Sequence, residues 1–354
     1  MTAPSAPGVD RPAWLGRPAP GAEPAVSVVM PLRDAARFVP SALEQVLAQT
    51  FTDWELLVVL DGPDPETEEL LDGLSGAGGL RVLARPEPSG VAACRNAAVQ
   101  QARGRYVWFT DADDAWSPHL LERLHAAAVA GGCDVVLCRS EKQLPDGSRE
   151  PMPLPEAPAG VLAGEEYVRA LVAGTVNGHL WNKLFTRAVL GRDPFPLQRT
   201  RSDLGGVLGV TDRVRRAGVV DEVLYTWQVR EGSMSNSGVI TPMDLLACGE
   251  RFAQVAARLP AGQVREADRL RYLYNKIYRP ALARTWRYGD RAVDGDEVQR
   301  RVRAAVTARD LGVLWRDGAR GLALAAGAYR TAPRLTAAAA RRLRRGKWAR
   351  WDVA

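Results

Sequence analysis

Short apolar runs alternate with helical stretches over the first 140 residues, and this alternation constrains the fold more than any other feature. The apolar runs lie at residues 26–30, 54–60, 80–84, 106–110 and 134–138, and the stretches of helical periodicity lie at 41–49, 66–74, 91–102 and 120–129. Strands that alternate with helices of this length are typical of βαβ units, in which a mainly parallel sheet is covered by helices on both faces. The pattern therefore predicts an α/β fold. From about Asp244 onward the sequence is rich in Ala, Leu and Arg with helical periodicity, and it predicts no strands.

Acidic residues follow two of the predicted strands. Asp61 comes directly after the second run, and Asp111, Asp113 and Asp114 follow the fourth. Ligands of such sheets bind beyond the carboxyl ends of the strands, and Mg²⁺ or Mn²⁺ is held there by one or two carboxylates together with substrate phosphates. The alternative is an ordinary acidic turn, because Asp is a common turn residue. On this evidence alone the two interpretations stand about equal.

A longer series of motifs resembles family 2 glycosyltransferases, which have the Rossmann-like GT-A fold. The matching segments, in order, are 26–61, Arg95-Asn96, 111–114, 182–185, Asp203, and Leu224-Tyr225 together with 230–235. The resemblance covers about residues 25–238, and six motifs in the right order make it specific. It implies a GT-A sheet flanked by helices, with a helical C-terminal extension.

The resemblance also implies a site for a nucleotide-sugar donor. Asp61 matches the acid that hydrogen-bonds the uracil ring, and thymine would present the same edge, so a UDP-sugar is expected and a TDP-sugar stays open. The remaining donor-side residues are Pro31 and Arg33 at the base and ribose, Arg95 close to the nucleotide, and Arg230 and Ser233 at the pyrophosphate.

The resemblance assigns the metal and the base to acids. Asp111 and Asp113 match the Asp-x-Asp motif, with Asp113 in direct contact with Mg²⁺ or Mn²⁺, and Asp203 matches the catalytic base. Ser202 stands where a Glu commonly precedes the base, which leaves the identity of the acceptor open. A surface ion pair with a neighbouring Arg, Arg199 or Arg201, is the alternative role for Asp203.

These residues together predict an inverting reaction. A bound cation and an Arg stabilise the charge that develops on the departing diphosphate. A single carboxylate deprotonates the acceptor hydroxyl as it attacks the anomeric carbon from the opposite face, so the configuration at that carbon inverts. The expected acceptor is a cell-envelope glycan, a lipid-linked sugar or a wall polymer.

Charge divides the chain into two parts. From Arg300 to Ala354 there are fourteen Arg and Lys residues against three Asp and Glu, whereas residues 1–299 are mildly acidic. We expect a disordered tail at 1–24, a glycosyltransferase domain at 25–238 and a basic helical extension at 239–354. The segment 337–354 combines Arg and Lys with Leu and Trp, which suits an anionic membrane surface. We do not expect nucleic acid as a partner of the acidic body.

Targeting signals and cysteines bear on the compartment. No apolar run approaches the length of a membrane span, and the N-terminus has no apolar signal region. The cysteines, which have no metal-type pairing, are Cys94, Cys133, Cys138 and Cys248. We therefore expect a cytoplasmic protein, at the inner face of the membrane. Two alternatives from other classes stay open: a non-catalytic module that binds nucleotide-sugars or polysaccharide, and a basic membrane adaptor that works through its tail.

Overall fold

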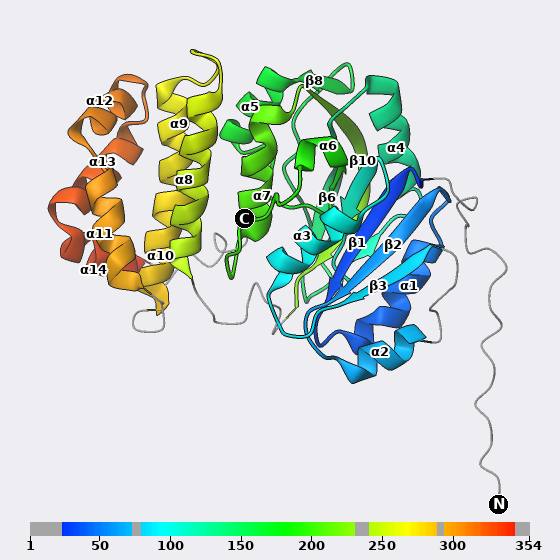
Figure 1. The fold of residues 1–354 in the computed structure, drawn as a ribbon. Coiled ribbons are helices and arrows are strands. Elements are labelled where there is room, and N and C mark those ends of the chain that lie inside the picture. The colour runs from blue at the N-terminus through cyan, green and yellow to red at the C-terminus, as the bar shows by residue number, and fades with distance from the viewer. Residues whose placement is uncertain (1–22, 73–78, 231–240, 289–293, 344–354) are drawn as a thin grey trace, which may run out of the picture.

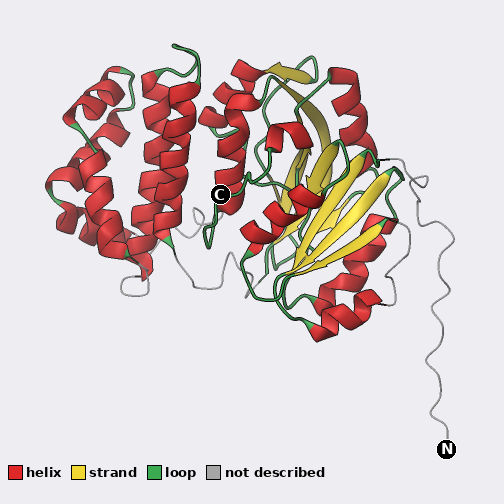
Figure 2. Cartoon of the chain, viewed as in Figure 1, coloured by secondary structure: helices red, strands yellow, loops and turns green. Residues whose placement is uncertain are grey.

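The computed structural model describes residues 23–72, 79–230, 241–288 and 294–343. A sheet flanked by helices lies beside a unit built only of helices, as Figures 1 and 2 show. The expected disordered tail at 1–24 falls almost entirely outside the described residues, as do the expected boundary at 238 and the last part of the basic segment, 344–354.

Ten strands form one mixed sheet. The strands are β1 (Val26–Leu32), β2 (Trp54–Leu60), β3 (Leu80–Ala84), β4 (Tyr106–Phe109), β5 (Ala115–Trp116), β6 (Val135–Gln143), β7 (Arg149–Pro151), β8 (Val161–Ala163), β9 (Lys183–Thr186) and β10 (Arg216–Gln228). Their order is β3-β2-β1-β4-β9-β6-β10-β5, with β7 paired to β6 and β8 to β10. All five predicted strands are present, each within a few residues of its expected position.

The helices fall into two groups. Those around the sheet are α1 (Val39–Leu47), α2 (Pro65–Asp72), α3 (Val91–Gln101), α4 (Leu120–Gly131), α5 (Gly164–Ala173), α6 (Arg187–Leu190) and α7 (Ser202–Val210), with the 3₁₀ turns η1 (Ala36–Phe38) and η2 (Thr211–Arg213). Those of the C-terminal unit are α8 (Pro242–Arg258), α9 (Glu266–Tyr272), the π-helical turn η4 (Leu273–Tyr278), α10 (Arg279–Tyr288), α11 (Gly295–Ala305), α12 (Ala308–Arg316), α13 (Arg320–Thr331) and α14 (Pro333–Leu343). The predicted absence of strands after Asp244 holds over the described part of this region.

The sheet is parallel only in part. Strands β3, β2, β1 and β4 run parallel, and so do β6 and β10, as the βαβ pattern predicts. β9 lies antiparallel between β4 and β6. The chain enters β9 at the edge of the sheet where β4 ends, and it therefore runs in the opposite direction to β4 and β6. Lys183, the first residue of β9, lies opposite Leu137 of β6. The loop that precedes β9 therefore reaches the same edge as the residues that follow β2 and β4.

Two apolar cores lie on the two faces of the sheet. Leu56, Val58 and Trp108 belong to the core that includes α1 and α4, whereas Leu57 and Val59 face the core that includes α3, α5 and α7. This alternation of consecutive β2 residues between two buried faces explains why the strand is apolar at every position except Glu55. The second core continues into the C-terminal unit, where α8 packs on α7 and α9 on α5.

None of the helices in the described residues is both long and apolar enough to span a bilayer.

Candidate active site

The carboxyl edge of the sheet gathers the acids that the sequence predicts. Since β1, β2, β4 and β10 all end at this edge, it collects Asp61 after β2, the loop 111–114 after β4, and Arg230 after β10. The N-terminus of α7 brings Asp203 to the same place, close enough for its charge to act on Asp111. Two segments about ninety residues apart in the chain thus supply one acidic cluster.

Asp61 is a buried carboxylate that binds the loop before α3. Its Oδ1 accepts hydrogen bonds from the backbone N–H of Ser89 at 2.6 Å and from the Ser89 hydroxyl at 3.1 Å, and its Oδ2 accepts from the Gly90 N–H at 3.0 Å. Gly90 has φ of +87°, which a residue with a side chain adopts only under strain. Burial acts to raise the pKa of Asp61, but the hydrogen bonds from Ser89 and Gly90 outweigh it and lower that pKa. Asp61 is therefore an anion, and its Oδ2 accepts fewer hydrogen bonds than its Oδ1.

Pro31 and Arg33 lie next to this carboxylate. Pro31 is half-buried in β1 opposite Val59, and Arg33 is exposed immediately beyond the strand. The guanidinium of Arg33 lies 3.7 Å from Oδ2 of Asp61. The structure thus brings together three of the predicted donor-side residues.

The three acids after β4 have different surroundings. Asp111 accepts a hydrogen bond of 3.0 Å from Arg95, which is almost fully buried on α3. Asp113 is half-buried and lies 3.5 Å from Arg230. Asp114 is buried and accepts from the Tyr225 hydroxyl at 2.8 Å and from the N–H of Gln228 at 2.8 Å. Asp114 therefore holds β10 against the loop, whereas Asp111 and Asp113 are the two that Arg side chains reach.

The acids of this cluster lie close enough together to raise one another's pKa. Burial is the largest cause that raises the pKa of Asp111, and the carboxylates of Asp113 and Asp203 raise it further against the opposing charge of Arg95. Burial likewise raises the pKa of Asp114 well above its ordinary value, with Asp111 and Asp113 adding to it. A cation placed among these acids would relieve their mutual repulsion.

The donor set fits a hard divalent cation that is completed by its substrate. Within the described ranges, the His, Cys, Asp and Glu side chains form no group of three arranged to hold a metal ion. Asp111 and Asp113 offer two carboxylates, and Mg²⁺ or Mn²⁺ bound with a nucleotide needs one or two of these, because phosphate oxygens and water supply the rest. Two carboxylates are thus enough in kind and number for such an ion.

Asp203 lies in the first turn of α7. Its Oδ1 accepts a 2.8 Å hydrogen bond from the N–H of Leu204, and its Oδ2 lies 3.8 Å from Nδ1 of His179. Among the described residues, His179 is the basic side chain that lies beside this carboxylate, and the ion pair with Arg199 or Arg201 that the alternative interpretation requires is not present. Arg201 precedes α7 and has φ of +61°. The turn at this residue orients the N-terminus of α7 toward the acidic cluster.

Lys183 shows why the Asn-Lys-Leu-Phe segment lies beside the site. Its ammonium group is fully buried and donates to Oδ1 of Asn177 at 2.9 Å, to the carbonyl of His179 at 2.7 Å and to Oδ1 of Asn182 at 2.8 Å. Burial lowers the pKa of Lys183 to about 7, yet three acceptors match the three N–H groups of the protonated form. Lys183 therefore holds the conformation of the loop before β9 through hydrogen bonds from the buried side of that loop.

Arg230 also stacks on an aromatic ring. Its guanidinium lies 4.4 Å from the centre of the Phe38 ring, and so does that of Arg37. Phe38 was not predicted as a site residue, and nothing in its sequence context indicates the contact. Ser233, the remaining donor-side prediction, lies outside the described residues.

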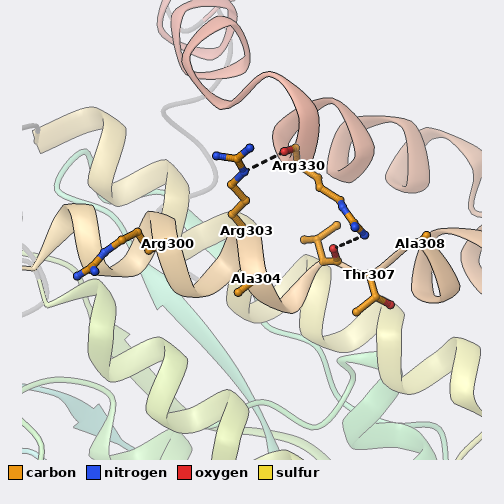
Figure 3. Close-up of a pocket in the computed structure, with 7 residues that line it drawn as sticks. Arg300, Arg303, Ala304, Thr307, Ala308 and Arg330 are labelled. Carbon is orange, nitrogen blue, oxygen red and sulfur yellow. Dashed lines mark hydrogen bonds between the residues drawn. The ribbon is translucent and has the colours of Figure 1, made fainter.

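Two surface hollows lie elsewhere. One of about 540 Å³ lies between α11, α12 and α13, where Arg300, Arg303 and Arg330 line it (Figure 3). The other, of about 760 Å³, is lined by residues that include Arg105, Asp134 and Arg187. Neither of these two hollows contains any of the predicted site residues.

Comparison with known proteins gives a family and a fold. Residues 27–189 match the model for "Glycosyl transferase family 2". The chain is 27% identical over 177 residues to the protein named "Putative glycosyltransferase EpsH" of Bacillus subtilis, covering 49% of this chain and about half, 51%, of EpsH. It is 34% identical over 97 residues to the Escherichia coli UDP-Glc:α-D-GlcNAc-diphosphoundecaprenol β-1,3-glucosyltransferase WfgD, covering 27% of this chain and 38% of WfgD.

A solved structure extends the likeness beyond the family match. Residues 1–349 of TarS from S. aureus, in complex with UDP-GlcNAc, superpose with a TM-score of 0.62 at 20% identity, covering 86% of this chain and 91% of that one. This likeness confirms the predicted GT-A fold and extends over much of the helical unit.

Proposed function

We propose that this chain, whose residues 27–189 belong to glycosyltransferase family 2, moves a sugar from a nucleotide-diphosphate donor to an acceptor hydroxyl in the synthesis of a cell-surface polymer. One observation carries the proposal: Asp111 and Asp113 meet Asp203 at one edge of the sheet, although the sequence separates them widely. A site of this kind has an acidic donor side and a separate carboxylate that can act as base. The proposed reaction needs both.

On the donor side, Asp61 and Arg33 would bind the base, and Arg95 and Arg230 would face the diphosphate. Oδ2 of Asp61 keeps room for the N3–H of uracil, since most of the internal hydrogen bonds go to Oδ1. A UDP-sugar is the donor we propose, and the solved relative that holds UDP-GlcNAc supports it.

Asp111 and Asp113 would hold a Mg²⁺ or Mn²⁺ ion that arrives with the donor. When bound, the ion would neutralise charge on the departing diphosphate. Arg95 lies 3.0 Å from Asp111, and Arg230 lies 3.5 Å from Asp113. Both guanidinium groups are therefore in place to pair with phosphate oxygens of the donor. The proposed roles of the acids and the arginines are therefore complementary.

On the acceptor side, Asp203 would accept the proton of the attacking hydroxyl. Because a single carboxylate acts as base and the attack comes from the face opposite the diphosphate, we propose inversion at the anomeric carbon. Ser202, buried beside it, leaves this position without a second acid.

The test is a panel of nucleotide sugars incubated with the purified full chain and Mn²⁺ or Mg²⁺, with nucleotide release as readout. Slow hydrolysis of the donor does not require the acceptor, so the acceptor need not be known. Release of UDP from one sugar is the expected result. If no donor is turned over and calorimetry detects no binding of UDP, the enzyme proposal is wrong and the binding-module and adaptor alternatives return.

We also propose that the basic C-terminal segment brings the enzyme to an anionic membrane, where a lipid-linked acceptor would lie. No Asp or Glu occurs between Asp317 and Asp352, and on α14 Leu335 is 73% exposed. WfgD, whose name contains a diphosphoundecaprenol acceptor, supports an acceptor of this class. Each basic residue near an anionic surface contributes about 1 kcal/mol.

Truncation after Leu343 is expected to weaken sedimentation with anionic phosphatidylglycerol vesicles at least tenfold, because it removes four of the basic residues. Donor hydrolysis should stay at the wild-type rate, since the described helices remain. Vesicles of phosphatidylcholine alone serve as the control. Equal sedimentation of both chains would show that the tail does not make the contact.

A further inference from the structure

Four aromatic rings form a continuous stack that runs beneath the acidic cluster. Trp116 stacks on Tyr225 with centroids 6.1 Å apart and planes 17° apart, and Tyr225 stacks on Trp181 at 4.5 Å and 9°. The fourth ring, His179, stacks on Trp181 at 4.7 Å and 20°. The first three rings are almost completely buried, which leaves the stack little freedom to move.

Two rings of the stack contact acids of the site. The Tyr225 hydroxyl donates to Asp114, which adjoins the proposed metal ligand Asp113. At the other end, Nδ1 of His179 lies 3.8 Å from Oδ2 of Asp203. The stack therefore connects the loop after β4 with the proposed base across the width of the site.

The backbone of the His179 segment is held as well. Lys183 donates to the carbonyl of His179 at 2.7 Å, and Nε1 of Trp108 donates to the carbonyl of Trp181 at 2.8 Å. The His179 N–H donates to Oδ1 of Asn177 at 3.1 Å. Ring and backbone are thus both constrained, and the imidazole faces Asp203 in a fixed direction.

We propose that His179 is a positioning residue for Asp203, which holds the Oδ2 side of the carboxylate while the Leu204 N–H holds Oδ1. This inference rests on the proposed function of Asp203 as base. Contacts at both oxygens fix the plane of the carboxylate, and its remaining lone pairs point to the acceptor hydroxyl. The 3.8 Å separation is longer than a hydrogen bond, and catalytic contacts commonly tighten only when the substrate is bound.

The surroundings keep this imidazole neutral. Burial is the main cause that lowers the pKa of His179 to about 4, with Lys183 and Arg201 acting in the same direction and Asp203 against it. A neutral N–H donor orients a carboxylate without the full positive charge that would make the carboxylate a weaker base. An Arg at the same place would orient Asp203 and also reduce its ability to accept a proton.

The test compares His179→Phe with His179→Asn in the full chain. Phe keeps the aromatic stack and removes the nitrogen, whereas the Asn amide places an N–H close to the position of Nδ1. We expect His179→Phe to lower kcat for donor turnover about 10- to 100-fold with an unchanged KM for the donor, in line with the loss of an orienting contact. His179→Asn should recover most of that loss.

A second readout separates positioning from packing. His179→Phe is expected to keep the wild-type Tm, because the phenyl ring preserves the stacking on Trp181. An unchanged kcat in His179→Phe would overturn the proposal, and so would an equal loss in both variants accompanied by a lower Tm. Wild-type turnover in the same assay distinguishes these outcomes from failure of the proposed function itself.

Discussion

Asp203→Asn is expected to reduce nucleotide release about 10³-fold, since general bases contribute about 10² to 10⁴ in rate. The amide keeps the shape of the side chain and can still occupy the place beside His179 and the Leu204 N–H. It has no lone pair basic enough to take the proton of an attacking hydroxyl. Binding of UDP, measured by calorimetry, should remain within about twofold of wild type, because the donor side is built from other segments.

The matched control for this change is Asp221→Asn. Asp221 is an exposed aspartate on β10 that pairs with Arg139 on the surface, and its loss should leave nucleotide release unchanged. A wild-type rate in Asp203→Asn would remove Asp203 from the mechanism and favour the interpretation of this acid as structural. A parallel loss of UDP binding would instead place it on the donor side.

The parallel half of the sheet could be predicted because its strands are buried on both faces. Residues 54–60 alternate between two apolar cores, so every position except Glu55 is apolar and the run is visible without any partner. β9 has no such pattern. It is four residues long and begins with Lys183, whose burial depends on three acceptors that only the folded loop brings together. An isolated Lys in a short segment indicates an exposed position, and here that indication is wrong.

The acids of the site could be predicted from their position after strands, and from the family resemblance in the case of Asp203. Their position after the strand alone could not separate the role of Asp114 from that of Asp113, because the difference lies in Tyr225, which the chain supplies more than a hundred residues later. His179 could not be identified for the same reason. Its stack is assembled from three separate segments, and sequence periodicity carries no information about contacts between them.

Asp113→Ala is expected to abolish the dependence of UDP binding on Mn²⁺ and to lower nucleotide release by about 10² to 10⁴, the range that several kcal/mol of charge stabilisation represents. The change removes one of two carboxylates proposed to hold the cation and frees Arg230 from its ion pair at 3.5 Å. Calorimetry of UDP with Mn²⁺, and again with a chelator, measures the first effect without any turnover.

The same titration in the wild type decides between two ways to stabilise the departing diphosphate. If UDP binds equally with Mn²⁺ and with chelator, and nucleotide release persists without metal, then Arg95 and Arg230 carry that role alone and the metal proposal is wrong. Asp111 and Asp113 would then serve to hold the two guanidiniums in place, and Asp113→Ala would lower release by displacing Arg230. A loss of UDP binding on removal of the metal from the wild type, absent in Asp113→Ala, instead assigns the cation to this acid.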